Sequence, residues 1–209
     1  MNKYVFLVEG DHSLRSDLEI ALNFSGYTVQ SFPDAEQFLL NFKPVAPAVL
    51  VTDMRMPKRS GIQLQMDLMS GGHKIPVIFI GGDCSNVEIV ESFKNGAFDF
   101  LFKPFDREEF LGAVAKAIQK ETVAMQDQVG RARLAERLKT LSPRQREVFD
   151  LLSLGFNNKE ITEKLRISLA TAKEYKSEVM YKLSLRSLSE LIALHARISD
   201  SKNTLTETH

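Results

Sequence analysis

Residues 141–191 have the sequence LSPRQREVFDLLSLGFNNKEITEKLRISLATAKEYKSEVMYKLSLRSLSEL, which predicts a domain built only of helices. Ser142, Pro143 and Gln145 together supply an N-cap, a proline at the first helical position and a capping partner three residues on. Three further apolar-periodic stretches begin at residues that cap helices well, namely Asn157, Ser168 and Ser187. We therefore expect four short helices and no strand between residues 141 and 198.

The second and third of these helices have the lengths of a helix-turn-helix. A helix of about eight residues, a tight turn and a helix of about four turns form that motif, whose second helix enters the major groove of DNA. Along residues 169–184, Ala172, Val179 and Leu183 keep an apolar face inward. The opposite face presents short polar and basic side chains suited to phosphates and base edges: Thr171, Lys173, Glu174, Lys176 and Ser177, with Lys182 further along as a phosphate contact.

The first 121 residues have a different pattern, in which apolar runs of strand length alternate with amphipathic helical stretches. The predicted strands are Tyr4–Val8, Tyr27–Ser31, Val49–Thr52, Val77–Ile80 and Phe98–Phe102. Five strands alternating with five helices predict a doubly wound, flavodoxin-like α/β domain with a parallel sheet covered on both faces. In such folds the functional groups lie at the carboxyl ends of the strands.

The two predicted domains are joined by a stretch that lacks strong helix breakers. From residue 106 to 139 the chain has no proline, so we expect the fifth helix to continue through residues 122–140 as a linker helix. Residues 199–209 have no apolar periodicity and predict a disordered tail.

Composition limits the class of protein and its compartment. Residues 1–121 carry a net charge of −4 and residues 122–209 a net charge of +4, so the neutral whole contains a basic part that suits a polyanion. Cys84 is the only cysteine, which fits a reducing compartment, and we expect it to be exposed in the loop after the fourth strand. No apolar run is long enough to span a membrane, so we expect a cytoplasmic protein without membrane contact.

The stretches LSPRQREVFDLLSLGFNNKEIT and ISLATAKEYKSEVMYKLSLRSLSEL closely resemble the DNA-binding domain of the LuxR/FixJ (NarL/FixJ) family of regulators. The resemblance implies a transcription regulator that binds double-stranded DNA as a homodimer. It assigns contacts with bases to Lys173, Glu174 and Ser177. It assigns contacts with phosphates to Asn158, Lys159, Thr171, Lys176 and Lys182.

Three residues depart from that family's pattern. Arg166 stands where the family usually has a glycine in the turn, which predicts a non-glycine residue at positive φ. Ala172 replaces a valine, and Tyr175 replaces a frequent histidine. We expect affinity or sequence preference to differ from those of close relatives.

The first 120 residues resemble the receiver domain of two-component response regulators, most specifically in VLVTDMRMPKRSGIQL and FLFKPF. The resemblance places Asp53 as the phosphorylated aspartate and Lys103 as the cation that stabilises the phosphoryl group, with a sensor histidine kinase as phosphoryl donor. It also implies a cis Lys103-Pro104 bond. The chemistry needs a carboxylate nucleophile, with an ammonium and Mg²⁺ to offset the charge that develops.

The predicted Mg²⁺ site is weakened at one position. Receivers use two adjacent acids after the first strand, the phosphorylated aspartate and a backbone carbonyl, here that of Arg55. Glu9 stands at the first acidic position, but Gly10 occupies the second, and Asp11 falls one residue too late. Because Mg²⁺ takes few protein ligands, losing one carboxylate should weaken the site substantially.

The residue pair that transmits phosphorylation in receivers is also altered. Gly81 stands where the family has a threonine or serine whose hydroxyl moves to the phosphoryl group, and Phe100 represents its aromatic partner. Glycine has no hydroxyl, so this coupling cannot operate as it does in the family.

Several interpretations of the first domain follow. In the one we favour, the receiver is controlled independently of phosphorylation, as Gly10 and Gly81 indicate. In the alternative, Asp53 is phosphorylated conventionally, as the retained Asp53 and Lys103 indicate. A third is a receiver that binds a partner protein or a small ligand. A phosphatase using Asp53 is not expected, because Arg55 stands where a general acid would be needed. The target genes, and whether the regulator activates or represses them, cannot be derived from the residues.

Overall fold

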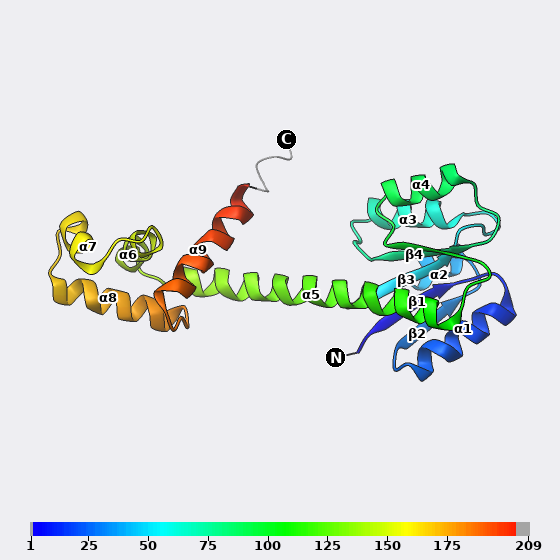
Figure 1. Ribbon diagram of the computed structural model, residues 1–209, viewed down its shortest axis with the longest axis horizontal. Helices are drawn as coiled ribbons and strands as arrows, with labels where there is room; N and C mark the ends of the chain where they lie inside the picture. The colour runs from blue at the N-terminus through cyan, green and yellow to red at the C-terminus, as the bar shows by residue number, and fades with distance from the viewer. Residues whose placement is uncertain (1, 204–209) are drawn as a thin grey trace. The chain divides into compact units, whose positions relative to one another are not determined.

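The computed structural model describes residues 2–203, and side chains for residues 2–195. It divides into two compact units, residues 1–127 and residues 128–209. The first unit contains a five-stranded sheet with strand order β2-β1-β3-β4-β5, and each neighbouring pair is parallel. Helices cover both faces of the sheet (Figure 1). The predicted doubly wound α/β fold is confirmed.

The elements of the first unit follow one another as strand and helix in alternation. In chain order they are β1 (Tyr4–Val8), α1 (His12–Phe24), β2 (Thr28–Phe32), α2 (Ala35–Asn41), β3 (Ala48–Asp53), α3 (Gly61–Ser70), β4 (Val77–Gly81), α4 (Asn86–Lys94), β5 (Asp99–Phe102) and α5 (Arg107–Lys139). Each predicted strand is found within one residue at either end.

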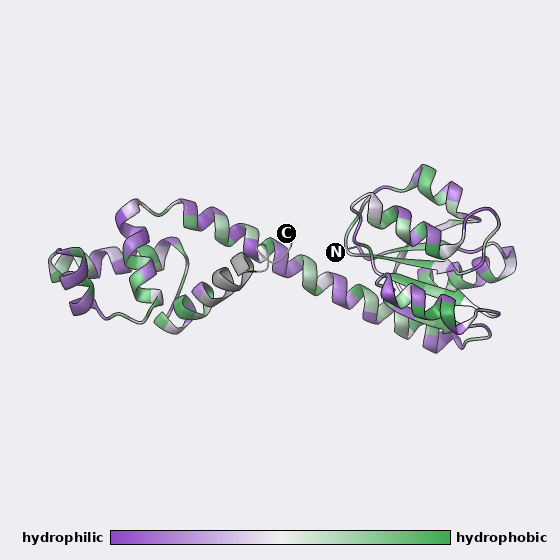
Figure 2. Cartoon of the chain, turned by 90° about the horizontal axis from the view of Figure 1, so that it is seen from above, coloured by the Kyte–Doolittle hydropathy of each residue, from purple (hydrophilic) through white to green (hydrophobic). Residues whose placement is uncertain are grey.

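The sheet is apolar on both faces, which is why its strands read as continuous hydrophobic runs. Successive side chains of a strand point to opposite faces, so Leu7 packs on the side of α1 and α5 while Phe6 packs on the side of α2 and α3. In Figure 2 the strands lie as a hydrophobic layer between helices of mixed character. The two cores hold the carboxyl ends of the strands in place, and the candidate site lies at those ends.

Helix α5 is continuous from Arg107 to Lys139, as the missing helix breakers predict. Its first part packs on the sheet through Phe110, Val114 and Ala117. Its last turns belong to the second unit, where Leu138 is buried in the helical core. None of the helices in the described part of the chain has the length and apolar character needed to cross a membrane.

The second unit contains the four predicted helices: α6 (Pro143–Ser153), α7 (Asn158–Leu165), α8 (Leu169–Lys182) and α9 (Leu188–Asn203). Ser142 and Asn157 each form a capping box, and Ser168 caps α8. Helix α9 does not end near Ile198 but runs to Asn203. Residues 199–203, predicted as part of a disordered tail, are therefore helical, because a regular backbone needs no apolar stripe to continue for one turn. Residues 204–209 lie outside the described residues.

Candidate functional site

Three charged side chains meet at the carboxyl edge of the sheet. Glu9 follows β1, Asp53 ends β3 and Lys103 follows β5. The ammonium nitrogen Nζ of Lys103 lies 2.6 Å from Oδ2 of Asp53 and 2.7 Å from Oε2 of Glu9. Parallel strands end at the same edge of the sheet. Glu9 and Asp53 therefore become partners of Lys103, although they precede it in the sequence by 94 and 50 positions. We call these three residues the acidic cluster.

The remaining carboxylate oxygens of the acidic cluster are also hydrogen-bonded. The amide of Asp11 donates to Oε1 of Glu9, and the amide of Arg55 donates to Oδ1 of Asp53, both at 2.9 Å. Glu9 is 1% exposed, so its negative charge depends on these partners. Burial opposes the charge of Lys103, but the hydrogen bonds that its ammonium donates to Asp53 and Glu9 outweigh this effect and raise the pKa of Lys103. The cluster is thus an ion triad with a net charge of −1, in which Glu9 is buried and Asp53 and Lys103 are half-buried.

The residues around the cluster do not assemble the usual Mg²⁺ ligand set. Gly10 offers no side chain at the second acidic position. The carboxylate of Asp11 instead caps α1, accepting from the amide of Leu14 at 2.9 Å, and this bond lowers the pKa of Asp11. Within the described chain no group of three or more histidine, cysteine, aspartate or glutamate side chains is arranged to hold a metal. The donor set therefore does not fit a Mg²⁺ site that needs three carboxylates.

Arg55 is fixed by a contact with α4. Its guanidinium lies 3.1 Å from Oε2 of Glu88, while its backbone amide donates a hydrogen bond to Oδ1 of Asp53. Hydrogen bonds from the amide and hydroxyl of Ser85, and then from Arg55, lower the pKa of Glu88 to about 2. Glu88 is therefore ionised at neutral pH, and the Arg55 side chain is held by α4. The role predicted for its carbonyl stays a prediction.

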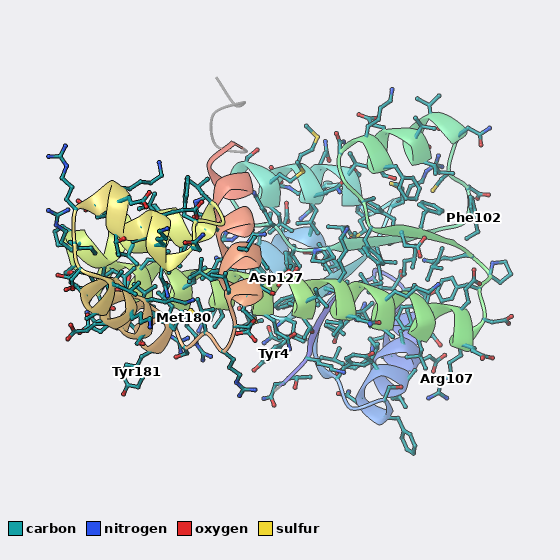
Figure 3. All side chains as sticks on the ribbon, turned by 60° about the vertical axis from the view of Figure 1, so that its left-hand side comes forward. Tyr4, Phe102, Arg107, Asp127, Met180 and Tyr181 are labelled. Atoms are coloured by element: carbon teal, nitrogen blue, oxygen red, sulfur yellow. The ribbon has the colours of Figure 1, made fainter. Side chains whose placement is uncertain are left out.

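The space beside Gly81 is filled by Cys84. A Cβ atom placed on Gly81 would lie 2.7 Å from Sγ of Cys84, 3.3 Å from Cβ of Met54 and 3.4 Å from Cζ of Phe100. Cys84 was expected to be exposed, but it is half-buried, and burial raises the pKa of its thiol. Phe100 is buried beside this thiol, whereas Phe102, labelled in Figure 3, is exposed. The thiol of Cys84 therefore stands where a threonine or serine side chain would project from position 81.

We expect Gly81→Thr to lower the free energy of unfolding of the first unit by about 1–2 kcal/mol, because the new side chain overpacks against Cys84, Met54 and Phe100. The variant Gly81→Thr/Cys84→Ala should recover at least half of this loss, since the nearest atom is removed. Hydrogen exchange of the β4 amides would measure the change in free energy of unfolding in both variants. Equal losses in the single and double variants would contradict the packing described for Cys84.

A second candidate surface lies on α8. Ala172 and Val179 are fully buried, as predicted for its inward face. Of the predicted base-facing residues, Lys173, Glu174 and Ser177 are all exposed. Of the predicted phosphate contacts on this helix, Lys176 is half-buried, and Thr171 is held by a 2.8 Å hydrogen bond between its hydroxyl and that of Ser168. The helix thus presents a polar face to solvent, although the contacts assigned to each residue stay predictions.

The predicted phosphate contacts on α7 lie at its first turn. Lys159 is exposed, and its amide donates to Oδ1 of Asn157 at 2.9 Å. Asn158 is half-buried, and its Oδ1 atom has no hydrogen-bond partner within the described residues. Both residues stand at a helix N-terminus, where backbone N–H groups favour anions.

Lys182 has a structural role that the residue pattern did not reveal. Its Nζ atom donates to the carbonyl of Thr140 at 3.0 Å and to Oε1 of Gln145 at 2.7 Å. Gln145 also donates to Glu178, and so joins α6 to α8. An ammonium has three donors, and two of them are used inside the unit. The phosphate contact predicted for Lys182 stays a prediction.

The turn between α7 and α8 has the predicted unusual backbone. Arg166 adopts φ 54° and ψ 47°, the left-handed conformation that glycine adopts at least cost. Its amide donates to the carbonyl of Thr162, which closes α7. The prediction of a non-glycine residue at positive φ is confirmed. The Lys103-Pro104 bond is cis, also as predicted.

Comparison with known families finds two matches that together cover most of the chain. Residues 5–115 match the response regulator receiver domain. Residues 139–195 match the bacterial regulatory proteins of the luxR family. The first match contains the acidic cluster, and the second contains α7 and α8.

Relatives of full length share both parts. The chain is 35% identical to nodulation protein W of Bradyrhizobium diazoefficiens over 204 residues, which cover 98% of this chain and 90% of the relative. It is 32% identical to the response regulator protein TodT of Pseudomonas putida, over 94% of this chain and 87% of the relative.

Solved structures agree with these matches. The response regulator StyR superposes with a TM-score of 0.79 at 34% identity, over 94% of this chain and all of StyR. Full-length FixJ from B. japonicum superposes with a TM-score of 0.60 at 32% identity, over 93% of this chain and 96% of FixJ. The chain belongs to the two-component response regulators of the NarL/FixJ type, transcription factors in which a receiver domain is joined to a LuxR-type DNA-binding domain.

Proposed function

We propose that this regulator controls transcription from the cytoplasm by binding promoter DNA as a homodimer, and that its receiver acts without Mg²⁺-dependent phosphorylation of Asp53. The exposed polar face of α8 supports the first part. A dimer of such domains would occupy two half-sites about one helical turn apart. The observation that carries the second part is the space beside Gly81, which Cys84 fills.

The charge of the acidic cluster also supports a receiver that does not depend on phosphate. The cluster already has a net charge of −1. Phosphorylation would replace the single negative charge of Asp53 with about −1.5 to −2, so the cluster would then carry about −1.5 to −2. Like charges confined to a partly buried site repel strongly unless cations offset them. In the described chain Lys103 is the one cation that forms an ion pair with the carboxylates of Glu9 and Asp53, and Gly10 offers no side chain at a usual Mg²⁺ ligand position.

The path from the phosphorylation site to the rest of the receiver is also altered. With Gly81 no hydroxyl can move toward Asp53, and the thiol of Cys84 occupies the space into which a side chain at position 81 would project. Phe100 is therefore held in its buried position by packing rather than by the state of Asp53. We infer that any input acts through contacts of the receiver other than an acyl phosphate.

A second candidate function is conventional phosphorylation of Asp53 by a sensor histidine kinase. The 2.6 Å contact between Asp53 and Lys103 favours it, because that ammonium could stabilise a phosphoryl group. Enzymatic activity of the chain itself is not proposed. The residue two positions after Asp53 is Arg55, which pairs with Glu88, and its guanidinium does not release a proton at neutral pH and so cannot act as a general acid.

Incubation with acetyl phosphate and Mg²⁺, followed by measurement of the intact mass, separates the two functions. We expect the wild type and Asp53→Asn each to keep its own unmodified mass, since neither forms an acyl phosphate. A related receiver known to accept phosphate from this donor serves as positive control. A phosphoryl adduct on the wild type that is absent from Asp53→Asn would contradict the phosphate-independent function and establish the conventional one.

A further inference from the structure

One face of α8 carries four side chains in line. Ala170, Glu174, Ser177 and Tyr181 are spaced so that they share a face of the helix, and all four are exposed. Tyr181 is 86% exposed and points away from the body of the second unit in Figure 3, which marks the direction of this face. The buried Ala172 and Val179 lie on the other side. We call these four residues the outward face.

Glu174 is the one acidic residue of the outward face, and it lies near the N-terminal end of α8. N-terminal residues of such a helix meet base edges when it enters the major groove. Within the described residues its carboxylate has no ion pair and no hydrogen bond, although Lys173 precedes it directly. Two other acids of this unit are engaged: Glu178 accepts from Gln145, and Glu160 completes the cap of α7.

A carboxylate without a partner is unfavourable on a surface that approaches DNA. Phosphates repel it, and the major groove presents mostly acceptors. The groove offers two donors to a side chain, the exocyclic amines of cytosine and adenine. Adenine places its acceptor N7 beside that amine, which suits the amide of asparagine or glutamine and repels a carboxylate. Cytosine presents only its N4 donor in the major groove.

We infer that Glu174 recognises a cytosine in each half-site of this regulator, accepting a hydrogen bond from the N4 amine, and is thereby a specificity-determining residue. The inference rests on docking of α8 in the major groove. It goes beyond DNA binding as such, because it fixes which base stands at one position of the site.

The substitution Glu174→Gln gives a sharp test, because glutamine pairs with N6 and N7 of adenine. Sites are selected from a random duplex library with the full-length wild type, with Glu174→Gln and with Glu163→Gln. Glu163 is an exposed acid on α7, so its variant makes the same change of charge away from the outward face. The wild type and Glu163→Gln should enrich cytosine at one position of each half-site, and Glu174→Gln should enrich adenine there.

Affinities for single duplexes then give the size of the effect. With cytosine exchanged for adenine at that position, the wild type should bind about tenfold more weakly and Glu174→Gln about tenfold more tightly. Glu174→Ala should bind both duplexes equally. The same selected base for the wild type and Glu174→Gln would overturn the inference while leaving DNA binding intact. No enriched site for the wild type would contradict the docking of α8, and the inference with it.

Discussion

Lys103→Met is expected to lower the free energy of unfolding of the first unit by about 3 kcal/mol, because it leaves the charge of Glu9 buried without its cation. The carboxylate of Asp53, 15% exposed, loses the same partner. Hydrogen exchange of the β3 amides, measured at increasing urea concentration, reports on this unit separately from the helical one. That separation matters, because a protein of two units need not unfold in one step.

Two variants serve as controls for this result. Lys58→Met removes a lysine from an ion pair with Glu36 at 2.9 Å in which both side chains are largely exposed, and it should cost less than about 1 kcal/mol. Glu9→Gln/Lys103→Met removes both buried charges and should recover most of the stability lost in Lys103→Met. A Lys103→Met variant as stable as Lys58→Met would show that the ion pair with Lys103 does not stabilise the buried charge of Glu9.

The direction in which the pKa of Lys103 is shifted determines how the stabilisation by its ion pairs varies with pH. The folded state raises the pKa of Lys103 above its ordinary value of 10.5. The ion pairs therefore stabilise the fold fully below that value and are lost as the pH rises through the folded-state pKa. The difference in stability between wild type and Lys103→Met should stay constant around neutral pH and narrow in strongly alkaline solution.

The sheet could be predicted because its strands are buried on both faces. Runs such as Val77–Ile80 have to be apolar at every position, and few other structures require that. The meeting of Asp53 with Lys103 follows from the same topology, since both residues stand where parallel strands end. Helix starts were equally predictable, because caps such as Ser142 and Asn157 act within four residues.

Contacts that depend on how helices cross or on the conformation of a loop could not be predicted. The bond of Lys182 to Gln145 spans 37 residues and depends on how α6 crosses α8. The position of the Cys84 thiol depends on the conformation of the loop between β4 and α4, and periodicity carries no information on it. The end of α9 was missed because no glycine or proline marks it, so nothing in the pattern sets a limit near Ile198.

Gly10→Asp should convert the acidic cluster into a functional Mg²⁺ site. A Cβ atom on Gly10 would have only the carbonyl oxygen of Pro33 within 4 Å, at 3.8 Å, apart from its chain neighbours, so the backbone leaves room for a side chain to begin there. The guanidinium of Arg15, which donates to the carbonyl of Glu9 at 2.5 Å, lies close enough to offset part of the added charge. The third carboxylate would stand beside Glu9 and near Asp53, and so complete the ligand set that the wild type lacks.

The expected gain can be measured as stabilisation of the fold by Mg²⁺. Loss of a residue that only supports a metal ligand costs about 10–100-fold in affinity, so a direct ligand should be worth about 100-fold. At a Mg²⁺ concentration equal to the wild-type Kd, the ion would then stabilise Gly10→Asp by about 2.7 kcal/mol and the wild type by about 0.4 kcal/mol. Thermal unfolding with Mg²⁺, compared with unfolding in chelator, gives this difference directly.

The controls decide whether Gly10 is the residue that limits the site. Gly130→Asp adds the same side chain to the exposed surface of α5 in the second unit, with no atom near it, and should show no response to Mg²⁺. Asp53→Asn in the Gly10→Asp background should abolish the gain, since the ion then loses a second carboxylate. If the wild type responds to Mg²⁺ as strongly as Gly10→Asp, the two carboxylates of Glu9 and Asp53 suffice. The receiver would then be competent for phosphorylation as it stands, and the packing of Cys84 against Gly81 would be the only obstacle left between Asp53 and Phe100.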